Sequence, residues 1–585
     1  MNRLNFTGVN MKIQILFVST LLCSLPLVAG EAPASGRESV PARATLDKQA
    51  LLIQPSTEVY VMEAAPHLRK QGTASQLIVD GKPFLVLSAE LGNNSGTSLE
   101  YMKSVWPRLV EGKVNTVMTG VSWAQIEPEE GKFDFRIVDG LIQEARSHNL
   151  RFVPLWFASW KNSLSSYPPP WVKRDFERFP RAQTSGGRSI ELLSPFSDAN
   201  RDADARVFTA LMRHIKDVDS LRHTVIMVQL ENEVGMHGDS RDRSPAANEA
   251  FAGPVPAELM DYIQQHKDTL NPDFSKLWAA NGSKTSGTWE EVFGQSKVTE
   301  GIFMAWYYAR YISHIAAAGK AEYPVPMFVN AALYGIGNGP QPASGGRPWD
   351  TVTDVWKAGG PQIDMLSPDS YGDKDFAAFC ARFARADNPL FVPENMGGAD
   401  GAARVLYMLG RHDAIGWTVM GIEDPKLVHP DLDLIGSFDL IKQMAPLISA
   451  HQGNGTMSAV LLRSPNDPPQ RIQLGNYTLN VSFYSPPRMF GVPPPKDPPP
   501  PAAALFIATG PEEYFVAGVG IKVTFSPNPD VPGPPLAGLA SVEDGTFVDG
   551  HWVPGRSLAG DDSDEGESLM MDWKAIQHFT LYRYK

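Results

Sequence analysis

Apolar runs that end in polar residues recur along the chain and mark its expected strands. Residues 224–228 are apolar and β-branched, as is typical of a strand covered on both faces by helices, and Glu233 follows shortly after them. A second apolar run at residues 389–393 leads directly to Glu394. In a barrel of parallel strands the functional side chains stand at the carboxyl ends of the strands. The two runs therefore predict two glutamates at one end of a barrel.

The region from residue 84 to residue 420 alternates such runs with amphipathic stretches. Helices are expected at residues 135–149 and 203–218 because their apolar positions recur with helical spacing. Repeated strand-then-helix units of this number and length predict an α/β fold, a (β/α)8 TIM barrel, which we assign to residues 76–450. The eight expected strands lie at residues 83–87, 115–120, 151–157, 224–233, 325–329, 363–366, 389–394 and 414–419.

One hairpin and two long loops complete the expected barrel. The Asp80-Gly81 pair lies between two apolar runs and predicts a tight hairpin turn. The segments 161–195 and 334–349 follow strands and are too long for simple connections. Because both would open at the carboxyl ends of strands, we expect them to wall the site.

After about residue 450, short alternating strands separated by turn residues replace the barrel pattern. This pattern predicts a smaller antiparallel β-sandwich-like domain at residues 451–585. The proline-dense stretch 486–501 cannot be a central strand and is expected to form an extended surface loop. Three roles are open to this domain: it could bind polysaccharide, shape the rim of the site, or form a homodimer.

The first thirty residues have the pattern of an export signal. Residues 13–23 form a short apolar run after Lys12, and residues 28–30 are small and suited to cleavage. Pro26 breaks the run, which favours a signal peptide at residues 1–30 over a stable membrane insertion.

The segment that follows is mixed and polar, and we expect residues 31–75 to be a linker and lead-in. Removal of the signal would leave Cys380 as the single cysteine, so an internal disulfide is excluded. We infer a bacterial protein that is periplasmic or secreted.

Composition narrows the class of ligand. A formal charge of −13 and a pI near 5.5 argue against a nucleic-acid partner. The 13 Trp and 16 Tyr suit a site that stacks sugar rings, although a large protein buries many aromatic side chains in any case. The sequence contains no phosphate-binding glycine loop, no His-Glu-x-x-His and no zinc-spaced Cys/His set, so no metal or organic cofactor is expected.

Two carboxylates are sufficient to cleave a glycosidic bond. One delivers a proton to the leaving oxygen, and the other either attacks the anomeric carbon or activates a water. A separation of about 5–5.5 Å gives retention of configuration, and a wider gap gives inversion. At the ends of the fourth and seventh strands, Glu233 and Glu394 would face each other. Their proximity would keep Glu233 protonated while Glu394 is ionised.

Further side chains near the strand ends could contact a sugar. Asn232 could donate a hydrogen bond to a sugar hydroxyl, or it could simply form a turn. Tyr371 follows the sixth strand and could hold the nucleophile by a hydrogen bond, although an isolated tyrosine more often packs. Three tryptophans lie where an indole could either stack on a pyranose or fill the core, namely Trp123, Trp160 and Trp417.

These motifs resemble a known family. Residues 228–235, Val-Gln-Leu-Glu-Asn-Glu-Val-Gly, closely resemble the acid/base motif of glycoside hydrolase family 35, which comprises retaining β-galactosidases with (β/α)8 barrels. Residues 126–135 are similar to its second-strand signature, and Ser88-Ala89-Glu90 is similar to its first. The resemblance implies that Glu233 is the acid/base and Glu394 the nucleophile. It also marks Glu90 as a substrate-binding residue.

The resemblance covers about residues 76–430, with two departures from the family pattern. Ser159 stands where the family usually has a glutamate that contacts galactose hydroxyls, and Gly92 stands where a histidine is common. These changes leave the chemistry intact and leave the identity of the sugar open. The tail resembles the C-terminal domain of a bacterial subgroup, some members of which remove galactose from xyloglucan side chains.

The sequence therefore predicts an exported, retaining exo-β-galactosidase that acts on terminal β-D-galactosyl residues, for example in plant cell-wall xyloglucan oligosaccharides. One alternative is the same retaining chemistry on a different sugar. Another is a non-catalytic carbohydrate-binding protein, although binding alone gives no reason for two carboxylates at barrel strand ends.

Overall fold

The computed structural model describes residues 64–236, 238–331, 345–371, 375–424, 430–484 and 499–585. The predicted signal peptide and most of the predicted linker lie outside these ranges. So do residues 334–344 of the second long loop and most of the proline-dense stretch of the C-terminal domain.

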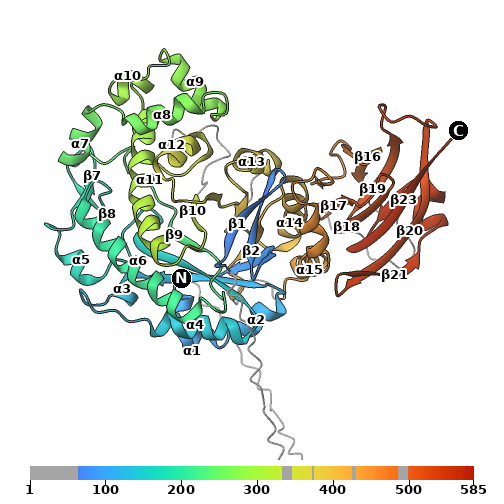
Figure 1. Cartoon of the computed structure of the whole chain (residues 1–585), viewed down its shortest axis with the longest axis horizontal. Helices are drawn as coiled ribbons and strands as arrows, with labels where there is room; N and C mark the ends of the chain where they lie inside the picture. The colour runs from blue at the N-terminus through green and yellow to red at the C-terminus, as the bar shows by residue number, and fades with distance from the viewer. Residues whose placement is uncertain (1–63, 237, 332–344, 372–374, 425–429, 485–498) are drawn as a thin grey trace, which may run out of the picture. The chain divides into compact units, whose positions relative to one another are not determined.

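Eight parallel strands form one sheet in the order β11-β10-β9-β6-β5-β4-β13-β12. The two end strands also meet, because the Ser370 N–H donates a hydrogen bond of 2.9 Å to the Glu394 carbonyl just beyond them. The sheet therefore closes into the predicted barrel, and all eight expected strands are present (Figure 1). Their bounds are β4 Val86–Glu90, β5 Thr116–Ser122, β6 Arg151–Lys161, β9 Val228–Asn232, β10 Met327–Ala331, β11 Met365–Pro368, β12 Phe391–Val392 and β13 Gly416–Met420.

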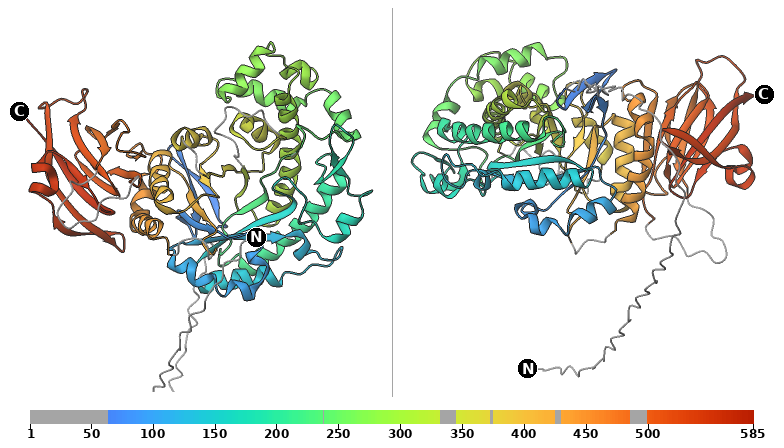
Figure 2. Two further views of the ribbon diagram at one scale, coloured as in Figure 1. Left: turned by 180° about the vertical axis from the view of Figure 1, so that it is seen from behind. Right: turned by 60° about the horizontal axis from the view of Figure 1, so that its bottom comes forward.

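Helices cover the outside of the barrel (Figures 1 and 2). The two helices expected from periodicity are present as α4 (Arg136–Ser147) and α6 (Asp198–Asp219). Helix α4 buries an apolar stripe at Val138, Leu141, Ile142 and Ala145, which is the spacing that the sequence shows.

The remaining helices follow in chain order. Among them, α7 to α10 form an insertion after β9 that the strand-and-helix count did not include. No helix in the described ranges combines the length and the apolar character needed to cross a bilayer. The bounds are α1 Leu99–Met102, α2 Trp106–Glu111, α3 Trp123–Ile126, α5 Pro170–Arg174, α7 Pro245–Ala252, α8 Ala257–Gln265, α9 Pro272–Ala280, α10 Trp289–Phe293, α11 Lys297–Glu322, α12 Thr353–Gly359, α13 Phe376–Phe383, α14 Gly398–His412 and α15 Leu432–His451.

A small antiparallel sheet closes the amino-terminal end of the barrel. The predicted hairpin is present, with β2 (Ala74–Val79) and β3 (Lys82–Pro83) joined by Asp80 and Gly81 at φ 50° and 70°. An additional strand, β1 (His67–Gln71), pairs with β2 within the segment that the sequence assigned to the lead-in. The apolar side chains of β2 pack against residues at the starts of the barrel strands. The hairpin therefore seals the end opposite the site.

The C-terminal region is antiparallel, as predicted. One sheet has the order β14-β17-β18-β23-β20-β21 and the other β15-β16-β19-β22, and the apolar faces of both sheets share one core. The strands are β14 Met457–Leu462, β15 Gln470–Leu474, β16 Tyr477–Phe483, β17 Ala502–Ala508, β18 Glu513–Val519, β19 Ile521–Pro527, β20 Leu536–Val548, β21 His551–Ser557, β22 Leu569–Met571 and β23 Ala575–Tyr584. A separate hairpin of β7 (Arg181–Gln183) and β8 (Ser189–Leu193) lies in the first long loop.

Candidate active site

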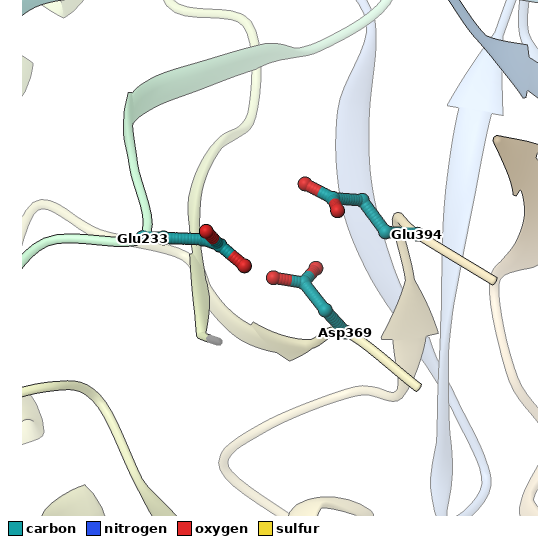
Figure 3. A group of neighbouring side chains, drawn as sticks. All are labelled: Glu233, Asp369 and Glu394. Atoms are coloured by element: carbon teal, nitrogen blue, oxygen red, sulfur yellow. The ribbon is translucent and has the colours of Figure 1, made fainter. Parts of the chain in front are cut away.

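The two predicted glutamates meet at the carboxyl end of the barrel. Glu233 follows β9, the fourth strand, and Glu394 follows β12, the seventh. Together with Asp369, which follows β11, each offers a carboxylate oxygen within 4.8 Å of the others. Figure 3 shows the three carboxyl groups pointing toward one another. The acids are therefore close enough to act on one glycosidic bond, as a pair of catalytic carboxyl groups must.

The backbone turns sharply where it delivers the acid. Glu231 and Glu233 have φ values of 57° and 46°, in the left-handed region that non-glycine residues seldom occupy. Such a conformation costs about 1–2 kcal/mol per residue and is found where the surrounding structure enforces it. Here the Glu233 N–H donates a 2.8 Å hydrogen bond to Asn330 Oδ1, which fixes the turn.

Three hydrogen-bond donors surround the Glu394 carboxylate. Asn232 Nδ2 and Asn330 Nδ2 donate to Oε1 at 3.2 and 3.0 Å, and the Tyr371 hydroxyl donates to Oε2 at 2.5 Å. Burial raises the pKa of Glu394, whereas the Lys161 ammonium and these three donors lower it. Burial is the largest of these effects, so the net pKa of Glu394 is raised, and the cation and the three donors offset part of that rise. The three hydrogen bonds orient the carboxylate for use as a nucleophile. Asn232 and Tyr371 both lie in the site, as the sequence predicted.

Glu233 has the properties of a general acid. Burial, followed by the charge of Glu394, raises the pKa of Glu233 to about 7. Its Oε1 atom has no hydrogen-bond partner among the described residues. A carboxyl group that stays protonated near neutral pH, with one oxygen open, can deliver a proton to a leaving group. The assignment of the two roles stays a prediction, and the geometry agrees with it.

Asp369 and Asn330 are site residues that the sequence reasoning missed. Burial, followed by the charges of Glu394 and Glu233, raises the pKa of Asp369 well above its usual range. Asn330 Nδ2 donates to Asp369 Oδ2 at 3.0 Å, and Asp369 also shares a hydrogen bond with Glu233. Asn330 thus contacts all three acidic residues. The available signal was position, because both residues stand at or directly after the end of an expected strand.

Three carboxyl groups this close are also the ligand type that hard cations prefer, and no other such group occurs among the described residues. The contacts here are of a different kind. Both Glu394 oxygens accept hydrogen bonds from neutral side chains, and the surroundings of Asp369 favour its protonated form. The group is arranged as hydrogen-bonded acids around one carboxylate rather than as a cation site.

Glu90, predicted to bind substrate, ends β4 beside these acids. Burial and the charge of Glu394 raise the pKa of Glu90 well above its usual range, and neither carboxyl oxygen has a hydrogen-bond partner in the described parts of the chain. Glu423, which the sequence reasoning missed, follows β13 and accepts hydrogen bonds from the Gly92 N–H at 2.5 Å and from Ser95 Oγ at 2.9 Å. A side chain at Gly92 would come within 3.2 Å of Glu423, so this close approach explains the glycine.

The three tryptophans do not face the site. Trp123, Trp160 and Trp417 are all fully buried, so no indole face is open to a sugar in this structure. Trp417 points outward from β13 onto Phe376, while its neighbour Thr418 points into the barrel. The proposed stacking role is therefore corrected to core packing. Trp123 begins α3 and donates a hydrogen bond to Glu127, Trp160 packs on Tyr308 and Tyr311 in the irregular part of β6, and only Trp417 is turned away by the two-residue alternation of a strand.

Lys161 is a further site residue that the sequence reasoning missed. It ends β6, and its ammonium donates a hydrogen bond to Asn232 Oδ1. Ser159, two residues earlier, points the other way: its hydroxyl bonds to Asp204 Oδ2 at 2.5 Å and to the Tyr311 hydroxyl at 2.8 Å. The side chain at position 159 therefore offers nothing to the acids.

Two family models match parts of the chain. A family model described as beta-galactosidase (Glyco_hydro_42) matches residues 98–307. A second model, described as a domain of unknown function (DUF5597), matches residues 434–570. The first match includes Glu233 and the second covers most of the antiparallel region.

Two curated relatives are similar over part of the chain. A beta-galactosidase of Xanthomonas manihotis is 29% identical over 184 residues, which is 30% of this chain and 28% of the relative. Beta-galactosidase BgaA of Thermus sp is 27% identical over 156 residues, which is 25% of this chain and 22% of the relative. The match thus spans about a quarter of the length of each curated relative.

Solved structures include distant likenesses of the barrel. The beta-galactosidase from Bacillus circulans sp. alkalophilus has a TM-score of 0.43 and 14% identity, over 62% of this chain and 57% of that one. The catalytic domain of beta-amylase from Paenibacillus polymyxa also has a TM-score of 0.43 and 14% identity, over 61% of this chain and 98% of that one. Similarities of this size do not distinguish one activity from another.

The comparisons correct the family and retain the class. The matching model is Glyco_hydro_42, and the resemblance to glycoside hydrolase family 35 is not supported. Glutamate at the end of a barrel strand after asparagine follows from the chemistry of two-carboxylate cleavage, so that motif does not separate one family from another. Over the matched part, the chain is similar to glycoside hydrolases described as beta-galactosidases.

Proposed function

We propose that this protein is a retaining exo-β-galactosidase that releases terminal β-D-galactosyl residues from oligosaccharides. The observation that carries the proposal is the meeting of the two acids: Glu233 and Glu394 converge from the fourth and seventh strands, and three side-chain donors hold Glu394. A carboxylate held in this way suits direct attack on an anomeric carbon. The match to a beta-galactosidase model supports galactose as the sugar.

The arrangement supports a double displacement. Glu233 donates its proton to the glycosidic oxygen while Glu394 attacks the anomeric carbon, which forms a covalent glycosyl-enzyme. Glu233, now ionised, takes a proton from water as the water attacks the same carbon, and this step releases the sugar and Glu394. The two asparagines and Tyr371 hold Glu394 in place for the first step.

The setting of the reaction is also part of the proposal. The export pattern at the start of the chain supports a periplasmic or secreted enzyme. Such an enzyme would meet plant cell-wall fragments outside the cytoplasm, and xyloglucan oligosaccharides are the proposed source of the galactosyl residues. Homodimerisation through that region stays an expectation.

A different sugar is the second candidate, and one observation favours it. Ser159 offers no carboxylate to a galactose hydroxyl, because its side chain points toward Asp204. A panel of aryl β-glycosides tests this candidate. Galactose should give the highest kcat/KM, and a higher value for another sugar would transfer the proposal to that sugar.

The experiment that tests the mechanism is proton NMR of the sugar released from an aryl β-galactoside, followed from the first minutes. We expect β-galactose first and its mutarotation afterwards. Release of the α-anomer first would contradict retention. Glu233→Ala and Glu394→Ala are the matched controls, and near wild-type hydrolysis by either variant would refute the assignment. If the wild type bound the sugars and hydrolysed none of the panel, a non-catalytic binding protein would be the better description.

A further inference from the structure

Lys161 is a buried cation with unused hydrogen-bonding capacity. Its side chain is only 7% exposed, and its Nζ lies 5.1 Å from the centre of the Phe157 ring. An ammonium group has three N–H donors, and among the described residues the single hydrogen-bond acceptor for Lys161 is Asn232 Oδ1. Its charge acts on Glu394, Glu233 and Glu90, and each of their pKa values is lowered by it. Two of its N–H groups therefore remain able to donate a hydrogen bond to a ligand. Such a bond would lower the cost of burying the charge.

The position of Lys161 identifies the ligand group that accepts this hydrogen bond. Asn232 lies between Lys161 and the nucleophile: its Oδ1 accepts from Lys161, and its Nδ2 donates to Glu394 Oε1. A sugar that reacts must place its anomeric carbon at Glu394. The hydroxyl nearest to that carbon is the one on C2. Asn232 and Lys161 are donors on one side of the carboxylate that the carbon must meet.

A bulge in strand β6 positions Lys161 beside Asn232. From Trp156 to Lys161, β6 advances five residues while β9 advances two, from Leu230 to Asn232, so β6 bulges outward. The backbone N–H groups of the bulge have no backbone acceptor on the neighbouring strand. The Glu231 carboxylate accepts them instead.

The contacts that hold the bulge are all buried. Glu231 accepts the N–H groups of Trp160 at 2.7 Å, Ser159 at 3.1 Å and Ala158 at 3.4 Å. Asp204 of α6 shares a hydrogen bond with Glu231 and ties the arrangement to the surrounding helix layer. Without the bulge, the regular alternation of β6 would place a different side chain beside Asn232. The position of Lys161 is thus fixed by several buried contacts.

We propose that Lys161 is a substrate-binding and specificity residue, whose ammonium donates a hydrogen bond to the C2 hydroxyl of the sugar that Glu394 attacks. The inference deepens the proposed function and rests on it. It implies that the enzyme requires an oxygen at C2 and strongly discriminates against 2-deoxy sugars. It also gives the site a charged hydrogen-bond donor that no sequence motif predicted.

The test is a cycle that combines a variant with an altered substrate. Lys161→Met keeps the length of the side chain and removes its charge and donors. For an aryl β-galactoside, kcat/KM should fall by roughly ten- to a hundredfold, the size expected for a hydrogen bond from a charged group. For the 2-deoxy analogue the same variant should lose less than about threefold, since that substrate lacks the partner. Lys161→Arg, which keeps a charged donor, should restore part of the loss.

Equal losses on both substrates would overturn the proposal, because Lys161 would then act only through Asn232 and the nucleophile. Loss of the hydrogen bond to the C2 hydroxyl should raise KM and lower kcat for the galactoside. A purely structural defect should affect the galactoside and its 2-deoxy analogue equally. Lys173→Met is the matched control, since Lys173 makes a 2.7 Å hydrogen bond to the Ser166 carbonyl in an exposed setting, and it should leave both rates unchanged. If Lys161→Met does not fold, Lys161→Gln provides the neutral variant.

Binding separates this proposal from the proposed function. Calorimetry with an uncleavable thio-β-galactoside and its 2-deoxy analogue measures the same coupling without catalysis. If the wild type binds the thioglycoside with a C2-dependent contribution from Lys161 yet cleaves no glycoside, the proposed function fails and the Lys161 assignment stands. If the wild type cleaves galactosides and Lys161→Met weakens both ligands equally, the Lys161 assignment fails alone.

Discussion

The two ends of the barrel treat acidic side chains in opposite ways. At the amino end, Asp80 in the hairpin turn accepts hydrogen bonds from Arg151 at 2.5 Å and from the His223 imidazole at 2.8 Å. Burial alone would raise the pKa of Asp80, but these partners outweigh burial and lower it. At the carboxyl end, burial and neighbouring charge raise the pKa values of Glu90 and Glu233.

The difference separates what holds the barrel together from what the barrel is used for. A paired acid at the sealed end contributes stability and binds nothing further. Acids that are buried together cost stability where one nearby cation, here Lys161, offsets only part of the effect of burial, and their unused oxygens are available to a ligand. The barrel therefore carries its binding and catalytic groups at the carboxyl end, and stabilising contacts at the amino end offset the free energy that burying those groups costs. Four substitutions test this contrast.

The largest effect is expected at the nucleophile. Glu394→Gln should lower kcat on an aryl β-galactoside by roughly 10⁵-fold, because Glu394 is the acid that three donors orient for attack on the anomeric carbon. Thermal unfolding should change little or shift upward, since a buried charge is removed. If the variant kept more than a tenth of the wild-type rate, Glu394 would not be the attacking group.

Tyr371→Phe should have the next largest effect. It removes one donor to Glu394, so kcat/KM should fall roughly a hundredfold. The hydroxyl lowers the pKa of Glu394, so the acidic limb of the pH–rate profile should move to higher pH. The limb would stay in place, or move to lower pH, if Tyr371 did not hold the nucleophile. Steady-state rates measured from pH 4 to 8 distinguish these outcomes.

Glu233→Gln should stabilise the protein above neutral pH while it abolishes activity. The folded pKa is about 7 and the reference value is 4.5, so the unfolded state gives up this proton more readily and folding loses stability as pH rises between the two values. Glutamine avoids that cost, which is roughly 3 kcal/mol at pH 8. Below pH 4.5 the two proteins should be equally stable. Urea unfolding at pH 4 and pH 8 measures the difference, and equal midpoints at pH 8 would remove the stability side of the contrast.

Asp80→Asn should have the smallest effect, and one opposite in kind. The pKa of Asp80 is lowered, so its stabilising contribution is present above the unfolded value of 3.8 and disappears as pH falls below it. Asparagine tolerates the left-handed turn and loses only the charge, so the free energy of unfolding at pH 7 should fall by about 1 kcal/mol. The rate of galactoside hydrolysis should stay within twofold of the wild type. A larger loss of rate would mean that the two ends are coupled.

Much of this architecture could be predicted because burial imposes a period on the chain. A barrel strand is covered on both faces, so each one appears as a short apolar run, and all eight were found in this way. The acids that follow such runs stand at one end of the barrel for the same reason. Glu233, Glu394, Asn232 and Tyr371 could therefore be assigned to one site from the order of residues along the chain, whereas Glu90 was assigned through a family resemblance.

Direction was harder to predict than position. The sequence placed Trp123, Trp160 and Trp417 near strand ends, and each is buried outside the site. Knowing that a residue ends a strand does not reveal whether it points to the axis or to the helices, because a shift of one residue reverses the face.

The sequence by itself determined the number of strands, their order along the chain and the two glutamates, since hydrophobic periodicity and the chemistry of strand ends are local properties. Only the tertiary structure decided that Asp369 and Asn330 complete the site and that Lys161 enters it. Asn330 and Asp369 meet Glu394 across the barrel, which no local pattern records. Lys161 depends on a bulge that Glu231 stabilises from a neighbouring strand, and such a change of register follows from contacts between strands rather than from the residues of one strand alone.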